Sequence, residues 1–139
     1  MRFFSPFRLA TYLLVLFFMG HTGGGMLAQK SLGPGADAVF DAMKSVHFVF
    51  NGADSTWYGF WFGFGIMVSA YIVFSAVVAW QLDKVPREHW PDVSAIAWAL
   101  AATQFAGALL SFKYFFLGPA LLGLAVTALV TLGILRKRA

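Results

Sequence analysis

Four apolar runs, each long enough to cross a lipid bilayer, occupy most of this 139-residue chain. They cover residues 9–28, 57–80, 93–112 and 116–135. A membrane-spanning helix needs about 20 apolar residues, and backbone groups in lipid must find hydrogen-bond partners within the protein. Only a few residues separate the last two runs, which predicts a helical hairpin. The sequence therefore predicts an all-α membrane protein, a single domain over residues 1–139 with four transmembrane helices in an antiparallel bundle.

The composition supports a membrane location and excludes several kinds of site. The chain is 60% hydrophobic and 12% charged, whereas a typical soluble domain has about 25% charged residues. Because there is no cysteine, disulfides, zinc–thiolate sites and iron–sulfur clusters are excluded. The net charge is +4, but the basic cluster at residues 136–138 follows an apolar run. That position favours contact with anionic lipid headgroups over nucleic-acid binding.

The distribution of basic residues predicts the orientation of the chain. With the N-terminus inside, the inner segments hold Arg2, Arg8, Lys84, Arg87, Arg136, Lys137 and Arg138, and the outer segments hold Lys30, Lys44 and Lys113. The positive-inside rule then favours both termini in the cytoplasm. The first run has a basic start and Ala28 in a small-residue position, so a cleaved signal peptide is an alternative. We expect an uncleaved first helix.

The longest connection, residues 29–56, contains a second amphipathic pattern. Apolar positions recur at helical spacing from Val39 to Phe50, and Asp37, Asp41 and Lys44 occupy the other face. This pattern predicts a short interfacial helix over about residues 36–50. We expect Asn51-Gly52 to end it, and Asp54 or Ser55 to cap the next membrane helix.

Small residues form stripes on three of the predicted membrane helices, and on the last two helices they recur every four positions. The stripes are Gly59, Gly63, Gly65 and Ser69; Ala95, Ala99, Thr103, Gly107 and Ser111; and Pro119, Gly123, Thr127 and Thr131. Because lipid tails are as apolar as leucine, close approach of backbones drives helix association in membranes. We interpret the stripes as packing surfaces within the bundle or against a partner. A ligand groove is the alternative.

Two histidines are the candidate ligating residues. His21 lies near the outer end of the first run, and His47 lies on the apolar side of the predicted interfacial helix, with Asp41, Asn51 and Asp54 nearby in sequence. Imidazoles with a carboxylate could bind a transition metal, and an axial histidine could ligate a tetrapyrrole. No diagnostic spacing is present, so we predict no metal site. In the simpler interpretation His21 hydrogen-bonds within the bundle and His47 sits among headgroups.

Residues 57–65 combine six aromatic residues with three glycines. One interpretation is an aromatic pocket in which Trp57, Tyr58 and Trp61, together with the two histidines, hold a lipophilic ligand such as a quinone, a carotenoid, a tetrapyrrole or a lipid. The other is an interfacial aromatic belt that continues into a packed helix.

The apolar runs offer little for catalysis or transport. They contain no carboxylate, and Gln104, the most polar residue within them, is explained by a hydrogen bond between helices. There is no recognisable nucleophile–base pair, phosphate-binding loop or pair of catalytic carboxylates. We therefore predict that the protein is not an enzyme, and we rank transport third among the functions considered.

Several stretches resemble a family of small, uncharacterised bacterial four-helix integral membrane proteins. The similarity lies in Gly20-His21-Thr22 after the first helix, Val39 to Met43 in the loop, Thr56-Trp57 running into Gly63-Phe64-Gly65, and residues 76–82. It covers about residues 8–82, and Tyr58-Gly59 departs from the more polar pair expected there. The resemblance implies a multi-pass protein of the bacterial inner membrane and assigns no chemistry.

Two functions of different kinds follow from these patterns. The first is an accessory or scaffold subunit, in which the small-residue stripes contact membrane lipids and other membrane protein subunits. The second is a binder of a lipophilic ligand or cofactor through residues 57–65.

Overall fold

The computed structural model describes residues 4–28 and 30–138. Arg2, which the orientation argument counts, lies outside these residues. The structure is 84% helical, and four helical segments within the described residues are long and apolar enough to cross a membrane. These segments are Pro6–Leu27, Trp57–Lys84, Arg87–Tyr114 and Leu117–Arg138. The prediction of a helical, multi-pass membrane protein is therefore confirmed at this level.

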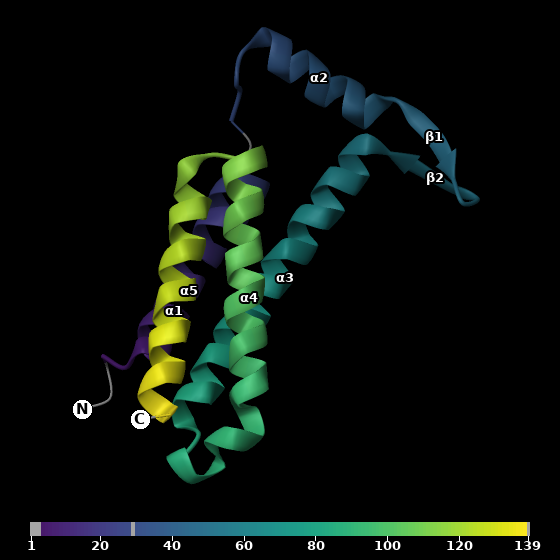
Figure 1. The fold of residues 1–139 in the computed structure, drawn as a ribbon. Coiled ribbons are helices and arrows are strands. Elements are labelled where there is room, and N and C mark those ends of the chain that lie inside the picture. Colours follow the sequence, from purple (N-terminus) through teal and green to yellow (C-terminus); the bar gives the residue numbers. More distant parts are fainter. Residues whose placement is uncertain (1–3, 29, 139) are drawn as a thin grey trace. The chain divides into compact units, whose positions relative to one another are not determined.

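The described chain forms nine elements and two compact units. In order they are α1 (Pro6–Phe18), the π-helix η1 (Met19–Leu27), α2 (Pro34–Ser45), β1 (His47–Phe50), β2 (Ala53–Thr56), α3 (Trp57–Lys84), the 3₁₀ turn η2 (Arg87–His89), α4 (Trp90–Tyr114) and α5 (Leu117–Arg138) (Figure 1). We call the unit made of the described residues up to Phe18 and from Ile72 onward the bundle unit. The outer unit is Met19–Tyr71.

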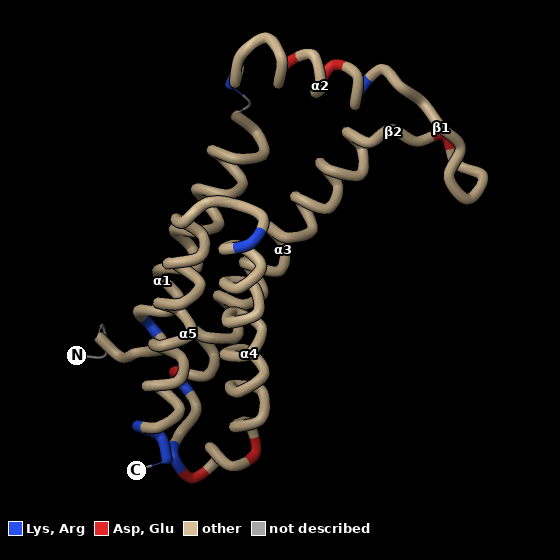
Figure 2. Tube along the Cα trace, turned by 45° about the horizontal axis from the view of Figure 1, so that its top comes forward, with Lys and Arg blue, Asp and Glu red and all other residues tan. Residues whose placement is uncertain are grey.

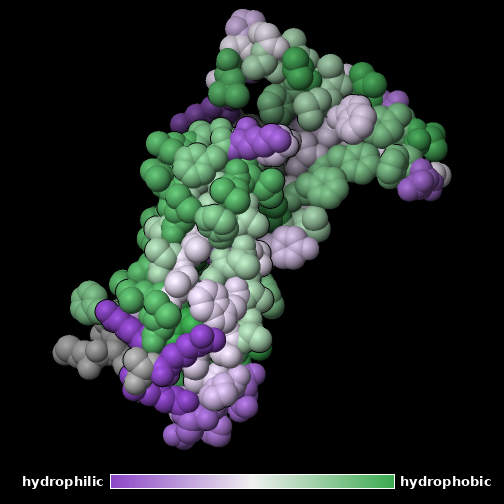
Figure 3. Space-filling view, in the orientation of Figure 1, coloured by the Kyte–Doolittle hydropathy of each residue, from purple (hydrophilic) through white to green (hydrophobic). Residues whose placement is uncertain are grey.

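The bundle unit has a compact apolar core. Its α4 and α5 pack along each other, and α1 packs against α5 (Figure 1). The core is centred on Phe7, Leu14, Val126, Val130 and Ile134, all fully buried. The visible face of α4 and α5 is largely hydrophobic, and hydrophilic side chains gather at the end where α5 finishes (Figure 3). This distribution fits helices whose sides face lipid and whose ends face water.

The membrane helices extend beyond the predicted apolar runs. The structure starts the first helix at Pro6 and ends the second at Lys84. Proline is well tolerated at a helix start, where its missing N–H would be unpaired in any residue, and the Ser5 hydroxyl accepts the Arg8 backbone N–H at 3.2 Å. At the C-terminal end of α3, the Asp83 carboxylate forms an ion pair with Arg8 Nε at 2.7 Å. This partner allows the last turn of α3 to contain a charged side chain.

One predicted contact inside the bundle is present. The Gln104 side-chain amide donates a hydrogen bond to the Ser75 hydroxyl at 3.0 Å, which joins α4 to α3. This hydrogen bond between helices accounts for a polar side chain within an apolar run.

The predicted interfacial helix is wrong over its last residues. In the structure α2 ends at Ser45, and residues 47–50 form strand β1, paired antiparallel with β2. The turn places Asn51 at φ 51° and Gly52 at φ 84°. Positive φ at both central residues is the geometry of a two-residue hairpin turn, for which Asn-Gly is the preferred sequence. The cap of α3 is Thr56, whose hydroxyl accepts the Gly59 N–H at 3.0 Å, and neither Asp54 nor Ser55 takes this position.

We expect Gly52→Val to open this hairpin, because a β-branched side chain at φ 84° costs about 1–3 kcal/mol of backbone strain. Limited proteolysis of the purified protein should then cut near residues 46–56 faster than in wild type. The control is Gly35→Val, because Gly35 lies in α2, outside the positive-φ region, with open space around it. Equal cutting of the two variants would contradict the hairpin.

Candidate functional site

His21 lies in the π-helical segment η1 and is tied to α3 within the outer unit. Its Nε2 is 3.0 Å from the Gly65 carbonyl oxygen, so this nitrogen carries the proton and donates. Next to it, the Thr22 hydroxyl donates to the Ser69 hydroxyl at 2.8 Å. Met26 packs directly over Gly65 and leaves no room there for a Cβ atom. Single π-helical turns often occur at functional positions, but these contacts give His21 a structural role.

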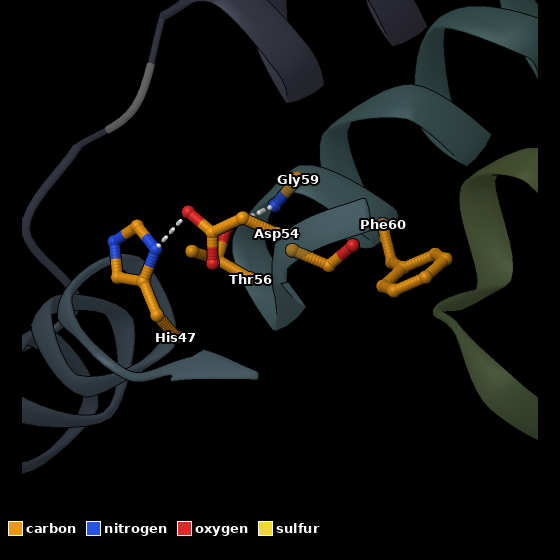
Figure 4. A pocket seen from close by; sticks show the side chains of 6 residues that line it. His47, Asp54, Thr56, Gly59 and Phe60 are labelled. Atoms are coloured by element: carbon orange, nitrogen blue, oxygen red, sulfur yellow. Dashed lines mark hydrogen bonds and ion pairs between the residues drawn. The ribbon is translucent and has the colours of Figure 1, made fainter. Parts of the chain in front are cut away.

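His47 lies on strand β1 and faces Asp54 on β2 (Figure 4). Its Nδ1 is 2.8 Å from Asp54 Oδ2, and the two side chains are 58% and 69% exposed. A contact between two side chains this exposed contributes at most about 1 kcal/mol. The pair borders an open pocket of about 340 Å³, which Ser55, Thr56, Gly59 and Phe60 also line.

The structure does not bring the two histidines together. His47 pairs with Thr56 in the hairpin register, whereas His21 contacts Gly65. Thr56 directly precedes α3, and at 1.5 Å per residue the start of α3 at Trp57 lies roughly 12 Å from Gly65 along the helix, while a metal ion needs ligand atoms at about 2 Å. No cluster of three histidine, cysteine, aspartate or glutamate side chains suited to a metal occurs in the described part of the chain.

The aromatic residues of the 57–65 segment pack mainly against one another and against the elements before them. The Trp57 ring lies 4.9 Å from Phe48 of β1, and the Trp61 ring lies 5.4 Å from Phe40 of α2. Tyr58 contacts Trp61 at 5.6 Å. These distances are typical of stabilising aromatic pairs. The aromatic side chains of this segment therefore pack α2 and the hairpin against the start of α3. This packing explains the aromatic residues without a bound ligand.

The small-residue stripes divide into a covered set and an uncovered set. On α5, Gly123 is buried, and a Cβ there would lie 3.0 Å from Ala108 Cβ and 3.3 Å from the Gln104 carbonyl oxygen. The predicted stripe on α4 instead points away from α5. Of its members Ala95, Ala99, Thr103 and Gly107 are exposed, and Ser111 is buried. The buried alanines of α4 are Ala97, Ala101 and Ala108.

Other small residues of the stripes are also divided between packed and exposed positions. Thr127 is half-buried and donates to the Gly123 carbonyl at 2.8 Å. Gly63 on α3 is exposed with open space around it, and Gly59 sits beside its capping residue Thr56. We call the exposed surface formed by Ala95, Ala99, Ala102, Thr103, Ala106 and Gly107 the open α4 face. A Cβ at Gly107 would meet nothing within 4 Å.

Sequence reasoning missed a charged cluster at one end of the bundle unit. Asp83, which follows the predicted apolar run 57–80, is 4% exposed and accepts hydrogen bonds from the Ser5 hydroxyl and from Arg8 Nε. Lys137 donates to the backbone carbonyls of Asp83 and Val85. Charged residues of both signs gather at this end (Figure 2). The available signal was that Arg8, Asp83 and Lys137 all flank apolar runs on the same predicted side of the membrane.

The comparisons with known proteins do not assign the chain to a family. We found no match to a protein-family model, to a curated protein or to a solved structure.

Proposed function

We propose that this protein is a non-catalytic accessory subunit of a larger membrane complex, and that its open α4 face receives a transmembrane helix of another subunit. The observation that carries the proposal is the contrast between two glycines. Gly123 is already packed against α4, whereas a Cβ atom added at Gly107 would meet nothing within 4 Å beyond its own helix. The four spanning segments are only 22–33% buried, so most of the helical surface is available to lipid or to partners.

The chemistry of the open α4 face favours a helix as its occupant. Small side chains let two backbones approach closely, and this close packing stabilises helix pairs in a bilayer that offers no hydrophobic drive. Thr103 donates to the Ala99 carbonyl of its own helix at 2.9 Å, so its hydroxyl is already satisfied and does not require water. The only polar side chain of the face, that of Thr103, therefore has a hydrogen-bond partner within α4.

The distribution of basic residues also bears on how the chain is oriented in the membrane. We propose an antiparallel four-helix arrangement with both termini in the cytoplasm, in the bacterial inner membrane, as the family resemblance implies. In support, the described cations on the proposed inner side are Arg8, Lys84, Arg87, Arg136, Lys137 and Arg138, against Lys30, Lys44 and Lys113 on the outer side. The positive-inside rule favours this orientation.

Cysteine-directed cross-linking tests the open α4 face. Since the chain has no cysteine, a single Ala99→Cys or Thr103→Cys places the only thiol on this face. We expect a short thiol–amine reagent in native membranes to give one adduct of fixed mass. The matched control is Leu121→Cys, which puts the thiol on an exposed position of α5. Equal labelling from both positions would contradict a specific face, and an adduct of twice the chain mass would identify a second copy as the occupant.

The alternative function, binding of a lipophilic ligand, is favoured by one observation, the pocket of about 340 Å³ beside Phe60 and Gly59. A ligand binder should lose an extractable quinone or pigment on Phe60→Ala or His47→Ala, which change the lining of this pocket, while its helix content stays the same. The accessory-subunit proposal predicts that the absorption spectrum and extract of both variants equal those of wild type. A visible-absorbing or quinone-containing fraction that disappears in either variant would favour the ligand binder.

A further inference from the structure

The charged end of the bundle unit contains a pocket with a basic lining. Its volume is about 450 Å³. The polar or charged side chains on its wall are Ser5, Asp83, Arg87, Arg136 and Lys137, and the apolar part is Pro6, Phe7, Val85 and Pro86 with Gly133. The residues come from the start of α1, the end of α3, the following turn and the end of α5. Three cations therefore share one opening with a single carboxylate.

That carboxylate is neutralised locally. Asp83 accepts from Arg8 Nε at 2.7 Å and from the Ser5 hydroxyl, and Arg8 itself stacks over the Trp80 ring at 3.5 Å. The Asp83 charge is therefore balanced by a cation that does not line the pocket. An anion in the pocket meets the net positive charge of the other three basic side chains.

Two of those side chains keep donor capacity for a ligand. Arg87 uses one Nη2 hydrogen on the Arg136 backbone carbonyl at 3.0 Å, and a guanidinium has five N–H donors. Among the described residues neither Arg87 nor Arg136 has a carboxylate partner. Guanidinium groups bind phosphate oxygens well because their paired N–H groups match the spacing of two oxygens.

We infer that this pocket binds the phosphate group of an anion through Arg87, Arg136 and Lys137. The phosphate would belong to the headgroup of an anionic phospholipid or to free phosphate, since both present the same oxygens. Basic pockets between membrane helices on the cytoplasmic side are suited to anionic headgroups. The apolar wall of Phe7 and Pro86 would then lie beside the glycerol and upper acyl chain of a lipid. The inference does not depend on the proposed accessory role.

Lipid binding to the full-length protein in neutral detergent tests the inference. Wild type, titrated with phosphatidylglycerol and followed by native mass spectrometry, should bind about tenfold more tightly than Arg87→Gln/Arg136→Gln, because two charge-assisted hydrogen-bonding groups are lost. The control Lys44→Gln/Lys113→Gln removes the same charge elsewhere and should bind like wild type. Equal binding by wild type and the arginine variant, or equal weakening by the control, would overturn the inference.

Two further arms complete the experiment. Millimolar inorganic phosphate that displaces the lipid would identify free phosphate as a source, and persistence of the lipid would identify the headgroup. Phosphatidylcholine should bind more weakly than phosphatidylglycerol, because its ammonium group opposes the three cations. If the double variant does not fold, Arg136→Gln alone replaces it, since the side chain of Arg136 makes no described hydrogen bond. Unchanged affinity in that single variant would also count against the pocket.

Discussion

Asp83→Asn should lower the free energy of unfolding by about 3 kcal/mol, because it removes one partner of a mostly buried ion pair. Asp83 is 4% exposed and Arg8 is 18% exposed. The asparagine amide keeps the size of the carboxylate but leaves the Arg8 guanidinium without its counter-charge beside the apolar core. Reversible unfolding in mixed micelles, followed by circular dichroism, measures the loss.

Two further variants show whether the effect comes from the pair. Asp92→Asn removes an exposed carboxylate in the first turn of α4 and should cost only about 0.5 kcal/mol, the usual size of a helix-dipole contribution. Replacing both partners, as Arg8→Leu/Asp83→Leu, should recover part of the stability, because no buried charge is then left unpaired. Equal losses for the Asp83 and Asp92 variants would show that the ion pair does not hold α1 to α3.

Gly123→Leu should destabilise the bundle by about 3 kcal/mol or more, whereas Gly107→Leu should leave its stability close to that of wild type. At position 123 a Cβ would lie 3.0 Å from Ala108 Cβ and 3.3 Å from the Gln104 backbone oxygen. Because backbone cannot move as a flexible side chain does, α4 and α5 would have to separate, which is the costly form of overpacking. At position 107 the same side chain enters open space.

The comparison is well matched because both variants replace glycine by leucine inside a membrane helix. Any gain in intrinsic helix propensity, about 0.8 kcal/mol, is therefore common to the two and cancels. Thermal unfolding in detergent, monitored by size-exclusion chromatography, gives the difference between them. Similar midpoints for both variants would contradict the packing of α5 on α4 through Gly123.

The four membrane helices were predictable from run length and apolarity, because the bilayer fixes how many apolar residues a span needs. The ends were less predictable. The first helix begins before its apolar run and the second continues past its own, since Arg8 and Asp83 satisfy each other across the two helices. That pairing depends on tertiary structure, and a pattern read along one segment does not contain it.

The hairpin could have been predicted from Asn51-Gly52, which favours a two-residue turn. The helical spacing of Val39, Phe40 and Met43 continues through His47 and Phe50, and this continuity masked the change of period. Residues 47–50 alternate poorly in polarity, but aromatic and β-branched residues are favoured in strands. The turn chemistry was therefore the stronger local signal.

The direction in which the small-residue stripes face could be predicted only in part. On α5 the stripe around Gly123 does face α4. On α4 small residues lie on more than one side of the helix, and besides the regular stripe through Ala99 the sequence has Ala97, Ala101 and Ala108. Only the structure shows that Ala97 is covered and Ala99 is not. The same composition leaves exposed small residues on α4, the face that we propose for a partner.

We propose that the open α4 face joins this protein to another membrane subunit. The most direct measurement is the protein inventory of tagged wild type and tagged Gly107→Leu, each purified from native membranes in a gentle detergent. We expect one membrane protein to co-purify in fixed ratio with wild type and to be lost from the Gly107→Leu fraction, with the variant itself still folded. A wild-type protein that purifies alone, or a partner retained in full by Gly107→Leu, would contradict the proposal.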